Sequence, residues 1–198
     1  SLYYDRAHSF FCYRYPSTLP ATVCERMERV SVDFLSHIGY DNSPFNIEFF
    51  WDEESDRVSL LEVNSRISQS HSFLYHQVDG ASNHQVLVEC ALGEQPHFPH
   101  RQGPNGAAGK YHIRTFEDGI VRHAPGDEEL RRIEREMPHV YVERKADEGD
   151  RLSDQPDRDS YSYRLADAYI AAEDNDRLRA RYRELLDRLD FQIEPVEE

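Results

Sequence analysis

The chain has 198 residues, of which 38 are acidic and 23 are basic, so its net charge is −15. This length predicts one domain, or two small ones, with enough chain to bury a core. Aromatic residues make up 12% of the chain, which excludes a disordered acidic tail. The acidic surface argues against nucleic acid and anionic membranes as partners. No stretch approaches the ~20 apolar residues of a membrane span.

Basic residues and cysteines are both unusual in this chain. Lys110 and Lys145 are its two lysines, so the other 21 of the 23 basic residues are arginine. We interpret this bias as a solvated surface from a GC-rich or salt-adapted source. The three cysteines, Cys12, Cys24 and Cys90, are odd in number and widely spaced. They argue against a disulfide scaffold and predict a reducing compartment, the cytoplasm.

The first half of the chain alternates between helical and strand patterns. A helix is expected after Pro20, with Thr22 and Glu25 as a capping box and Gly39 as its end. Its apolar positions recur at helical spacing: Val23, Met27, Val30, Phe34 and Ile38. Strands are expected at Phe45–Trp51 and Val58–Asn64, and short helices near residues 72–78 and 83–92.

The second half reads as a mixture of strands and helices behind a linker-like stretch at residues 95–109. Strands at 111–116 and 120–123 flank Glu117-Asp118-Gly119, which is a hairpin signature. A helix at 127–137, a strand at 140–144, a strand marked by Tyr161, Tyr163 and Leu165, and a final helix near 178–189 follow. This order favours an α+β fold over a parallel sheet.

Two glutamates on neighbouring strands carry the chemistry. If the strands pair symmetrically about Ser55, Glu48 lies opposite Glu62 and Asn46 opposite Asn64, all on one face. Carboxylates facing each other at about 5 Å repel, so solvent, a shared proton or a divalent cation must offset the cost. Two carboxylates and an amide oxygen suit Mg²⁺. An ordinary solvated sheet face remains the alternative on spacing alone.

The local sequence resembles the metal-binding hairpin of the ATP-grasp superfamily. Asn46-Ile47-Glu48-Phe49 matches its N-x-E-F strand, and Leu61-Glu62-Val63-Asn64-Ser65-Arg66 matches its [IL]-E-[VM]-N-x-R strand. The resemblance covers roughly residues 9–95. It implies that residues 1–100 are the C-terminal lobe of an ATP-grasp domain, an antiparallel sheet flanked by helices. Residues 101–198 are then expected to form a small β-rich α+β domain.

The resemblance also implies a function for each matching residue. Glu48, Glu62 and Asn64 match the metal ligands of the family, and Arg66 matches its catalytic, phosphate-binding arginine. The implied cofactors are ATP and Mg²⁺, or Mn²⁺ in its place. In the implied chemistry a ligase activates a small carboxylate as an acyl phosphate, which an amine or similar nucleophile then attacks.

Parts of the ATP-grasp pattern are missing from this sequence. The family also uses a glycine-rich flap and phosphate-binding lysines, and neither lysine here precedes the hairpin. We therefore expect the chain to be part of a longer polypeptide, inactive alone, whose N-terminal half is a partner; a homodimer stays open. Ser68-Gln69-Ser70 stands where biotin carboxylases carry Gln-Val-Glu, which favours carboxylate–amine ligases such as L-amino-acid ligases.

Two alternatives remain from the sequence. A non-catalytic ATP-grasp-like binding or regulatory module would keep the fold without the chemistry. A histidine-based zinc hydrolase is more distant, because His71, His76 and His84 lack the i, i+4 spacing that places ligands on one helical face. His71 is instead a candidate for the substrate side, because it follows Ser68-Gln69-Ser70 directly.

Overall fold

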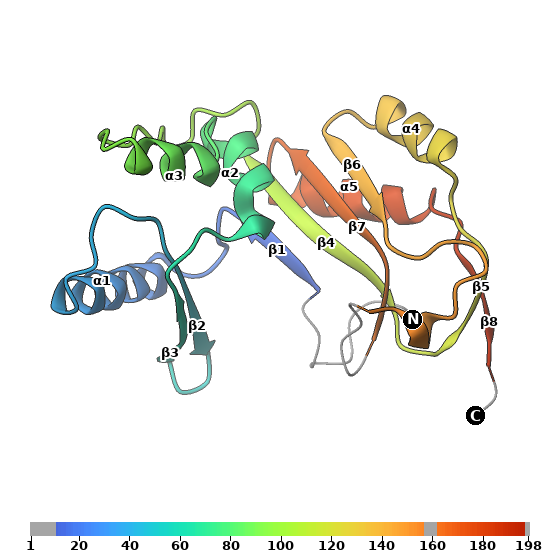
Figure 1. Ribbon diagram of the computed structural model, residues 1–198, viewed down its shortest axis with the longest axis horizontal. Coiled ribbons are helices and arrows are strands. Elements are labelled where there is room, and N and C mark those ends of the chain that lie inside the picture. The colour runs from blue at the N-terminus through green and yellow to red at the C-terminus, as the bar shows by residue number, and fades with distance from the viewer. Residues whose placement is uncertain (1–10, 157–161, 197–198) are drawn as a thin grey trace. The chain divides into compact units, whose positions relative to one another are not determined.

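The computed structural model describes residues 11–156 and 162–196. The described chain divides into two compact units, which we call the hairpin unit (residues 16–104) and the sheet unit (residues 11–15 with 105–196). Figure 1 labels their helices and strands. All strand pairings are antiparallel, which confirms the predicted α+β class.

The hairpin unit contains a long helix, a two-stranded sheet and two short helices, as predicted. Its elements are α1 (Ala21–His37), β2 (Asn46–Asp52), β3 (Arg57–Asn64), the 3-10 turn η1 (Gln69–His71), α2 (Ser72–Asp79) and α3 (Asn83–Ala91). Strands β2 and β3 pair only with each other among the described residues. Gly39 follows α1 and Gly80 caps α2, both in the left-handed conformation that glycine adopts without steric cost.

Helix α1 differs from its prediction at its start and in its burial. The expected capping box is wrong, because Pro20 is the N-cap, Thr22 lies inside the helix, and no side chain caps it. Of the predicted apolar stripe only Val23 is buried, while Val30 is 39% exposed and Ile38 is 53% exposed. The C-terminal half of this stripe is therefore an apolar surface.

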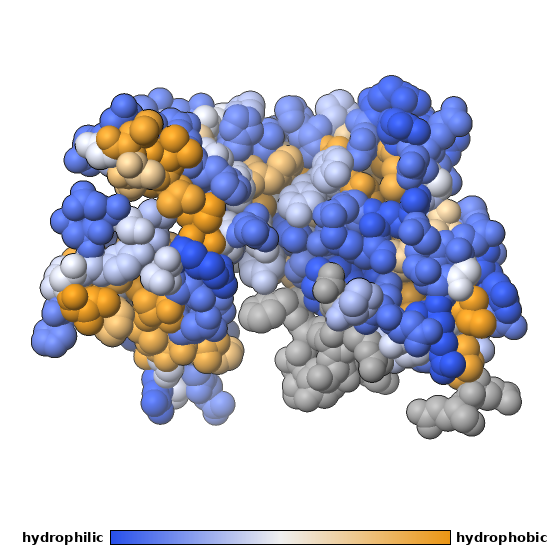
Figure 2. Space-filling view, in the orientation of Figure 1, coloured by the Kyte–Doolittle hydropathy of each residue, from blue (hydrophilic) through white to orange (hydrophobic). Residues whose placement is uncertain are grey.

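Helix α3 carries Val86, Leu87 and Val88 yet has no buried residue. Val88 is 56% exposed and Leu92, which follows the helix, is 69% exposed. Figure 2 shows apolar residues gathered at the surface where Figure 1 places α3. Single exposed apolar side chains are normal, but a contiguous apolar patch usually marks a surface that contacts another protein surface or a ligand. The patch on α3 is of the second kind.

The sheet unit is built on a four-stranded antiparallel sheet. Its elements are β1 (Cys12–Tyr15), β4 (Ala107–Thr115), β5 (Gly119–His123), α4 (Asp127–Glu136), β6 (Val140–Arg144), the 3-10 turn η2 (Leu152–Asp154), β7 (Tyr163–Ala172), α5 (Asn175–Leu186) and β8 (Gln192–Pro195). The sheet order is β1-β4-β7-β6, and β5 pairs separately with β8.

Two expectations for this unit are wrong. The strands flanking Glu117-Asp118-Gly119 do not form a hairpin, because β4 pairs with β1 and β7 while β5 pairs with β8. The linker-like stretch ends earlier than expected, because β4 already begins at Ala107 and includes Gly109. The expected strand residue Tyr161 lies outside the described residues, whereas Tyr163 and Leu165 lie in β7 as expected.

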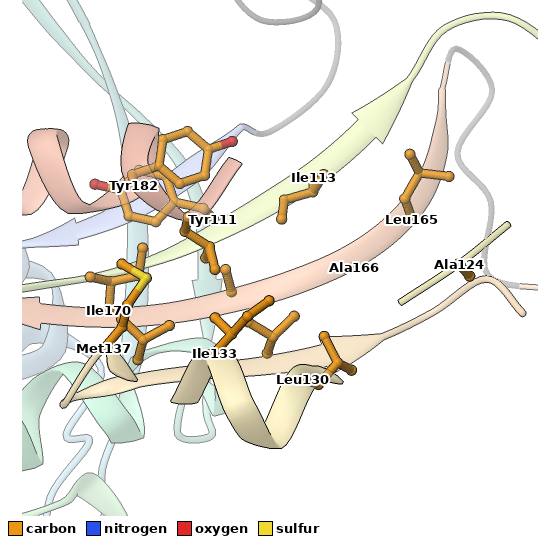
Figure 3. Packing of buried hydrophobic residues seen from close by; sticks show 14 of the residues in the cluster. Tyr111, Ile113, Ala124, Leu130, Ile133, Met137, Leu165, Ala166, Ile170 and Tyr182 are labelled. Atoms are coloured by element: carbon orange, nitrogen blue, oxygen red, sulfur yellow. The ribbon is translucent and has the colours of Figure 1, made fainter. Parts of the chain in front are cut away.

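The core of the sheet unit lies between one face of the sheet and helices α4 and α5. Figure 3 shows Leu130 and Ile133 of α4 pointing towards the strands. Ile170 of β7 belongs to the same buried cluster. Tyr111 of β4 stacks on Tyr182 of α5, with ring centroids 4.1 Å apart. Both helices therefore cover the same face of the sheet, and the opposite face carries different side chains.

Within the described ranges, no helix has the length and apolar character needed to cross a membrane. Cys12, Cys24 and Cys90 are all free thiols.

Candidate functional site

The two glutamates singled out from the sequence face each other across the β2–β3 hairpin. Glu48 pairs with Glu62, and Asn46 pairs with Asn64, so both predicted pairings are confirmed. Directly opposed residues of an antiparallel pair have Cβ atoms about 4.5–5.5 Å apart and share one face. The backbone thus brings two carboxylates and two amides together at the end of the hairpin away from its turn.

The expected pairing is symmetric about Ser55 along the whole hairpin. The observed hairpin is symmetric only at the end that carries Glu48 and Glu62. The register shifts after Glu48, so that Phe49 faces Leu60 and Leu61 is an extra residue on β3. This β-bulge has a physical reason, because strict alternation would place Leu60 on the same face as Glu62. With the bulge, Leu60 joins Phe49 on the apolar face, and Glu62 stays opposite Glu48 on the polar face.

The polar face is partly solvated. Glu62 is exposed, whereas Glu48 is half-buried. Asn46 Nδ2 donates a weak hydrogen bond to Glu48 Oε1 at 3.5 Å. Asn64 Nδ2 is buried and has no hydrogen-bond partner among the described residues. A buried amide without a hydrogen-bond partner raises the free energy of the folded state. A ligand or a water bound at Asn64 would remove that cost.

Arg66, two residues beyond Asn64, is exposed. Its Nη1 donates to the backbone oxygen of Ile67 at 3.2 Å. In the part of the chain that the structure describes, it forms no ion pair with a carboxylate. Its guanidinium can therefore offer several donors in the fork geometry that matches phosphate or carboxylate oxygens.

The segment after Arg66 is tied to the two short helices. Asn83 Nδ2 donates to the backbone oxygen of Ser68 at 2.7 Å, and His71 Nδ1 lies 2.6 Å from Ser68 Oγ. The His71 ring also stacks on Tyr75. Sequence reasoning named His71 but not Asn83, since nothing local in the sequence links residues fifteen positions apart. These bonds restrict the loop that follows the candidate arginine.

The opposite end of the hairpin is fixed to α1. Arg26 bonds Asp56 through both the backbone oxygen, at 3.0 Å, and the carboxylate, at 2.5 Å. Trp51 Nε1 donates to the same carboxylate at 3.1 Å. The hydrogen bond from Trp51, followed by that from Arg26, lowers the pKa of Asp56. No local pattern predicts this connection between helix and turn, because Arg26 and Asp56 lie 30 residues apart.

Metal-ligand clusters of the usual kind are absent from residues 11–156 and 162–196, where no three His, Cys, Asp or Glu side chains converge. The candidate hairpin offers two carboxylates and amide oxygens instead. Such a set suits a hard cation that keeps several other oxygen ligands, which is how Mg²⁺ is usually bound. The residues present therefore fit Mg²⁺ shared with a phosphate-bearing ligand, and they do not fit a self-sufficient zinc site.

Comparison with known proteins identifies the region that carries this hairpin. Residues 15–95 match the family model of the carbamoyl-phosphate synthase L chain, ATP binding domain. Residues 15–95 are an ATP-grasp segment. The resemblance stated from the sequence is thus confirmed over this range. No curated protein matches the chain in sequence.

Solved structures resemble the chain in fold. An L-amino acid ligase from Bacillus licheniformis has a TM-score of 0.72 at 20% identity, over 94% of this chain and 44% of its own. Phosphoribosylglycinamide synthetase from Anaerococcus prevotii has a TM-score of 0.71 at 11% identity, over 93% and 45%. A biotin carboxylase from Campylobacter jejuni has a TM-score of 0.63 at 17% identity, over 97% and 41%.

These likenesses in fold extend beyond the matched segment to both units. At such low identities they show the fold alone. The chain spans less than half the length of each of these three proteins.

Proposed function

We propose that the chain is part of an ATP-grasp ligase that binds Mg–ATP and activates a small carboxylate as an acyl phosphate for attack by an amine. The observation that carries this proposal is the in-register pairing of Glu48 with Glu62, beside Asn64, inside the segment that matches an ATP-binding domain. Facing carboxylates repel unless solvent, a shared proton or a cation offsets the cost, and the match of this segment to an ATP-binding domain favours the cation.

Each candidate residue has a distinct role in this proposal. Glu48, Glu62 and Asn64 would hold Mg²⁺, or Mn²⁺ in its place, through their side-chain oxygens. The metal, when bound, would neutralise charge on the phosphate oxygens of ATP. Rotation of the Asn64 amide would bring its oxygen to the cation and free its buried nitrogen from a position where it has no acceptor.

Arg66 would stabilise the phosphoryl group during transfer. In the first step a carboxylate oxygen of the substrate attacks the γ-phosphorus of ATP, and the bond to the leaving ADP oxygen breaks. In the second step an amine nitrogen attacks the acyl carbon, phosphate leaves, and the amine loses a proton. Both steps place negative charge on phosphoryl oxygens, which a guanidinium binds in bidentate fashion. The exposed Arg66, held only by a backbone oxygen, is suited to this role.

The substrate class favoured is that of carboxylate–amine ligases, including L-amino-acid ligases. The loop after Arg66 carries Ser68, Gln69 and Ser70 and therefore has no carboxylate to act as a base there. Free cysteines fit a reducing cytoplasm. These assignments follow from the residues of the loop and the thiols.

The further partner in this proposal is another part of the same polypeptide. The exposed large apolar side chains of the described chain lie in the hairpin unit, with Tyr141 as the exception. They include Val30 and Ile38 of the α1 stripe and the surface of α3. A unit that leaves so much apolar surface in water usually contacts another protein surface. The other half of an ATP-grasp domain would cover it and supply the phosphate-binding lysines; a homodimer is the other arrangement.

The metal site can be tested on this chain directly. Trp51 is the one tryptophan of the chain and lies three residues from Glu48, about 10 Å along the strand. Excited at 295 nm, it will sensitise Tb³⁺ luminescence when this hard cation binds at the hairpin, and excess Mg²⁺ will reverse the signal. We expect Glu62→Gln to weaken Tb³⁺ binding at least fivefold. Glu54→Gln, in the exposed turn, is the matched control and leaves binding unchanged.

Two outcomes distinguish the parts of the proposal. Tb³⁺ binding that is equal in wild type and Glu62→Gln contradicts the metal assignment. Activity is tested on the longer polypeptide that contains the lysine-bearing half, as carboxylate-dependent release of phosphate from ATP. Metal binding that depends on Glu62, without any turnover by that polypeptide, identifies the chain as a non-catalytic binding module. Unchanged turnover in Arg66→Ala contradicts the role given to that arginine.

A further inference from the structure

The sheet unit has a second chemical feature on the face of its sheet that α4 and α5 do not cover. Side chains alternate between the two faces of a strand, so Tyr111 and Ile113 of β4 point into the core. Lys110 and His112, between them in the sequence, therefore lie on the opposite face. Asp167 pairs with His112 in the register of β4 and β7 and lies on that same face.

Asp167 is the centre of a buried charged cluster. Its carboxylate lies 2.6 Å from His112 Nδ1, 3.1 Å from Lys110 Nζ and 3.6 Å from Arg164 Nη1. The side chains of Asp167, His112 and Lys110 are 2%, 5% and 11% exposed. Burial alone would raise the pKa of Asp167, but the hydrogen bond and charge of His112 and the charges of Lys110 and Arg164 lower it to about 2. The carboxylate is therefore ionised at neutral pH.

The cluster carries more positive than negative charge. Lys110 and Arg164 share the single carboxylate of Asp167, which leaves one positive charge in excess even with His112 neutral. Glu143 faces Asp167 from β6, but its carboxylate is bonded to Lys145. That pair adds no net charge. The side chain of Arg164 is 30% exposed, so the excess charge lies at the edge of the buried cluster, where an anion can reach it.

A second arginine lies beside the cluster. The register of β4 and β7 shifts so that Arg114 lies opposite Arg164. Like charges directly opposite in a sheet repel, as the two glutamates of the hairpin do. Arg114 is buried, and its Nη1 donates to Ser162 Oγ at 2.8 Å, so we do not count its charge towards the site.

Arg164 is the member of the cluster whose hydrogen bonds are incomplete. Its nearest approach to Asp167, 3.6 Å, is too long for a hydrogen bond. Its Nε is buried and has no acceptor among the described residues. A guanidinium with a buried unsatisfied N–H is a donor positioned for an acceptor with several oxygens. This observation is independent of the charge balance and points to the same kind of ligand.

We propose that the face of the sheet carrying Lys110, His112 and Arg164 binds a small oxyanion, either a carboxylate or a phosphate. Arg164 donates to it through Nε and a terminal nitrogen, and Lys110 supplies the second positive charge. Asp167 holds Lys110 and His112 in place beneath the site. The ligand neutralises the excess charge of the cluster. This site belongs to the sheet unit and does not depend on the cation site of the hairpin.

The experiment uses the 198-residue chain and two probes, inorganic phosphate and succinate, at constant ionic strength maintained with NaCl. Burial lowers the pKa of His112, and the neighbouring Arg164 and Lys110 charges lower it further against the pull of Asp167. A bound anion opposes those positive charges. We therefore expect saturable shifts of the His112 ring signals in NMR spectra and an upward shift of the His112 pKa on binding.

Variants separate the site from general ionic effects. Arg164→Gln keeps a polar side chain and is expected to weaken binding at least tenfold. Arg179→Gln on α5 is the matched control, because that arginine is 51% exposed and pairs only with an exposed aspartate among the described residues. We expect binding to be unchanged in this control. Lys110→Gln is the second variant, with an expected loss of similar size.

Each outcome decides the proposal. Saturation by phosphate alone, or by succinate alone, supports the site and identifies which oxyanion it takes. The absence of saturable binding by either probe up to about 20 mM overturns it. Equal binding by wild type, Arg164→Gln and Lys110→Gln also overturns it, since it shows only general screening. If Arg164→Gln fails to fold, the Lys110→Gln result decides.

Discussion

Replacing Asp167 with asparagine tests how much the buried cluster contributes to stability. The pKa of the Asp167 carboxyl is about 2 in the folded chain, against an ordinary value of 3.8. At about 1.36 kcal/mol per pKa unit, this difference corresponds to about 2.4 kcal/mol of stability from the ionised form. Asparagine keeps the size of the side chain and removes its charge. We therefore expect Asp167→Asn to lose about 2–3 kcal/mol at pH 7.

The sign of the pH dependence follows from the direction of the shift. A carboxyl whose folded pKa is lowered contributes its full stability above the unfolded pKa of about 3.9 and loses it as pH falls towards the folded value. The contribution of this carboxyl to the difference between wild type and Asp167→Asn is therefore constant from pH 7 to about pH 5. It shrinks between about pH 4 and pH 2, where the wild-type carboxyl takes up a proton in both states.

The assay is urea unfolding with probes that separate the two units. Near-ultraviolet circular dichroism of the stacked Tyr111 and Tyr182 reports on the sheet unit, and Trp51 fluorescence reports on the hairpin unit. In the variant, the urea midpoint of unfolding that the tyrosine signal reports should fall by about 1 M or more. Asp176→Asn, at a position 95% exposed, is the control and should behave as wild type. A variant as stable as wild type at pH 7, or a difference that persists at pH 2, refutes the reasoning.

Three further predictions concern the hairpin unit. Deleting Leu61 removes the bulge but keeps Glu62 on its face, so Tb³⁺ affinity should stay within about threefold of wild type; a tenfold loss contradicts the register. Gly103→Ala should cost about 1–3 kcal/mol in urea unfolding, because its Cβ would lie 2.4 Å from a backbone oxygen, whereas Gly126→Ala, with open space around it, should cost little. Arg26→Gln removes the partly exposed ion pair with Asp56 and should cost about 0.5 kcal/mol. It should also change Trp51 emission, because Asp56 accepts the hydrogen bond from the indole; unchanged emission contradicts this connection.

The hairpin could be predicted because its signals are local. Alternation of apolar and polar residues defines both strands, and the polar turn between them is short enough to set the pairing. The pairing of Glu48 with Glu62 followed from this geometry alone. The bulge at Leu61 was not predicted. The pattern nevertheless implies it, because strict alternation would place Leu60 on the polar face beside Glu62.

The sheet unit was harder to predict because its pairings connect distant parts of the chain. Strand β7 is rich in alanine, which has low β propensity, and is held as a strand by neighbours on both sides. The pairing of β5 with β8 joins residues 69 to 76 positions apart. The Asp167 cluster was missed for the same reason. His112 and Asp167 lie 55 residues apart, and no local pattern connects them.

The connection between the units has a practical consequence. The chain leaves the sheet unit after β1 and returns to it just before β4, and these two strands are antiparallel neighbours, with Tyr15 opposite Ala108. Residues 16–104 are therefore an insertion between two strand ends that already lie side by side. A short glycine-containing turn joining Tyr15 to Asn105 would close β1 and β4 into an ordinary hairpin. Excision of the ATP-grasp region in this way would give a smaller protein in which the oxyanion site can be studied without the metal site.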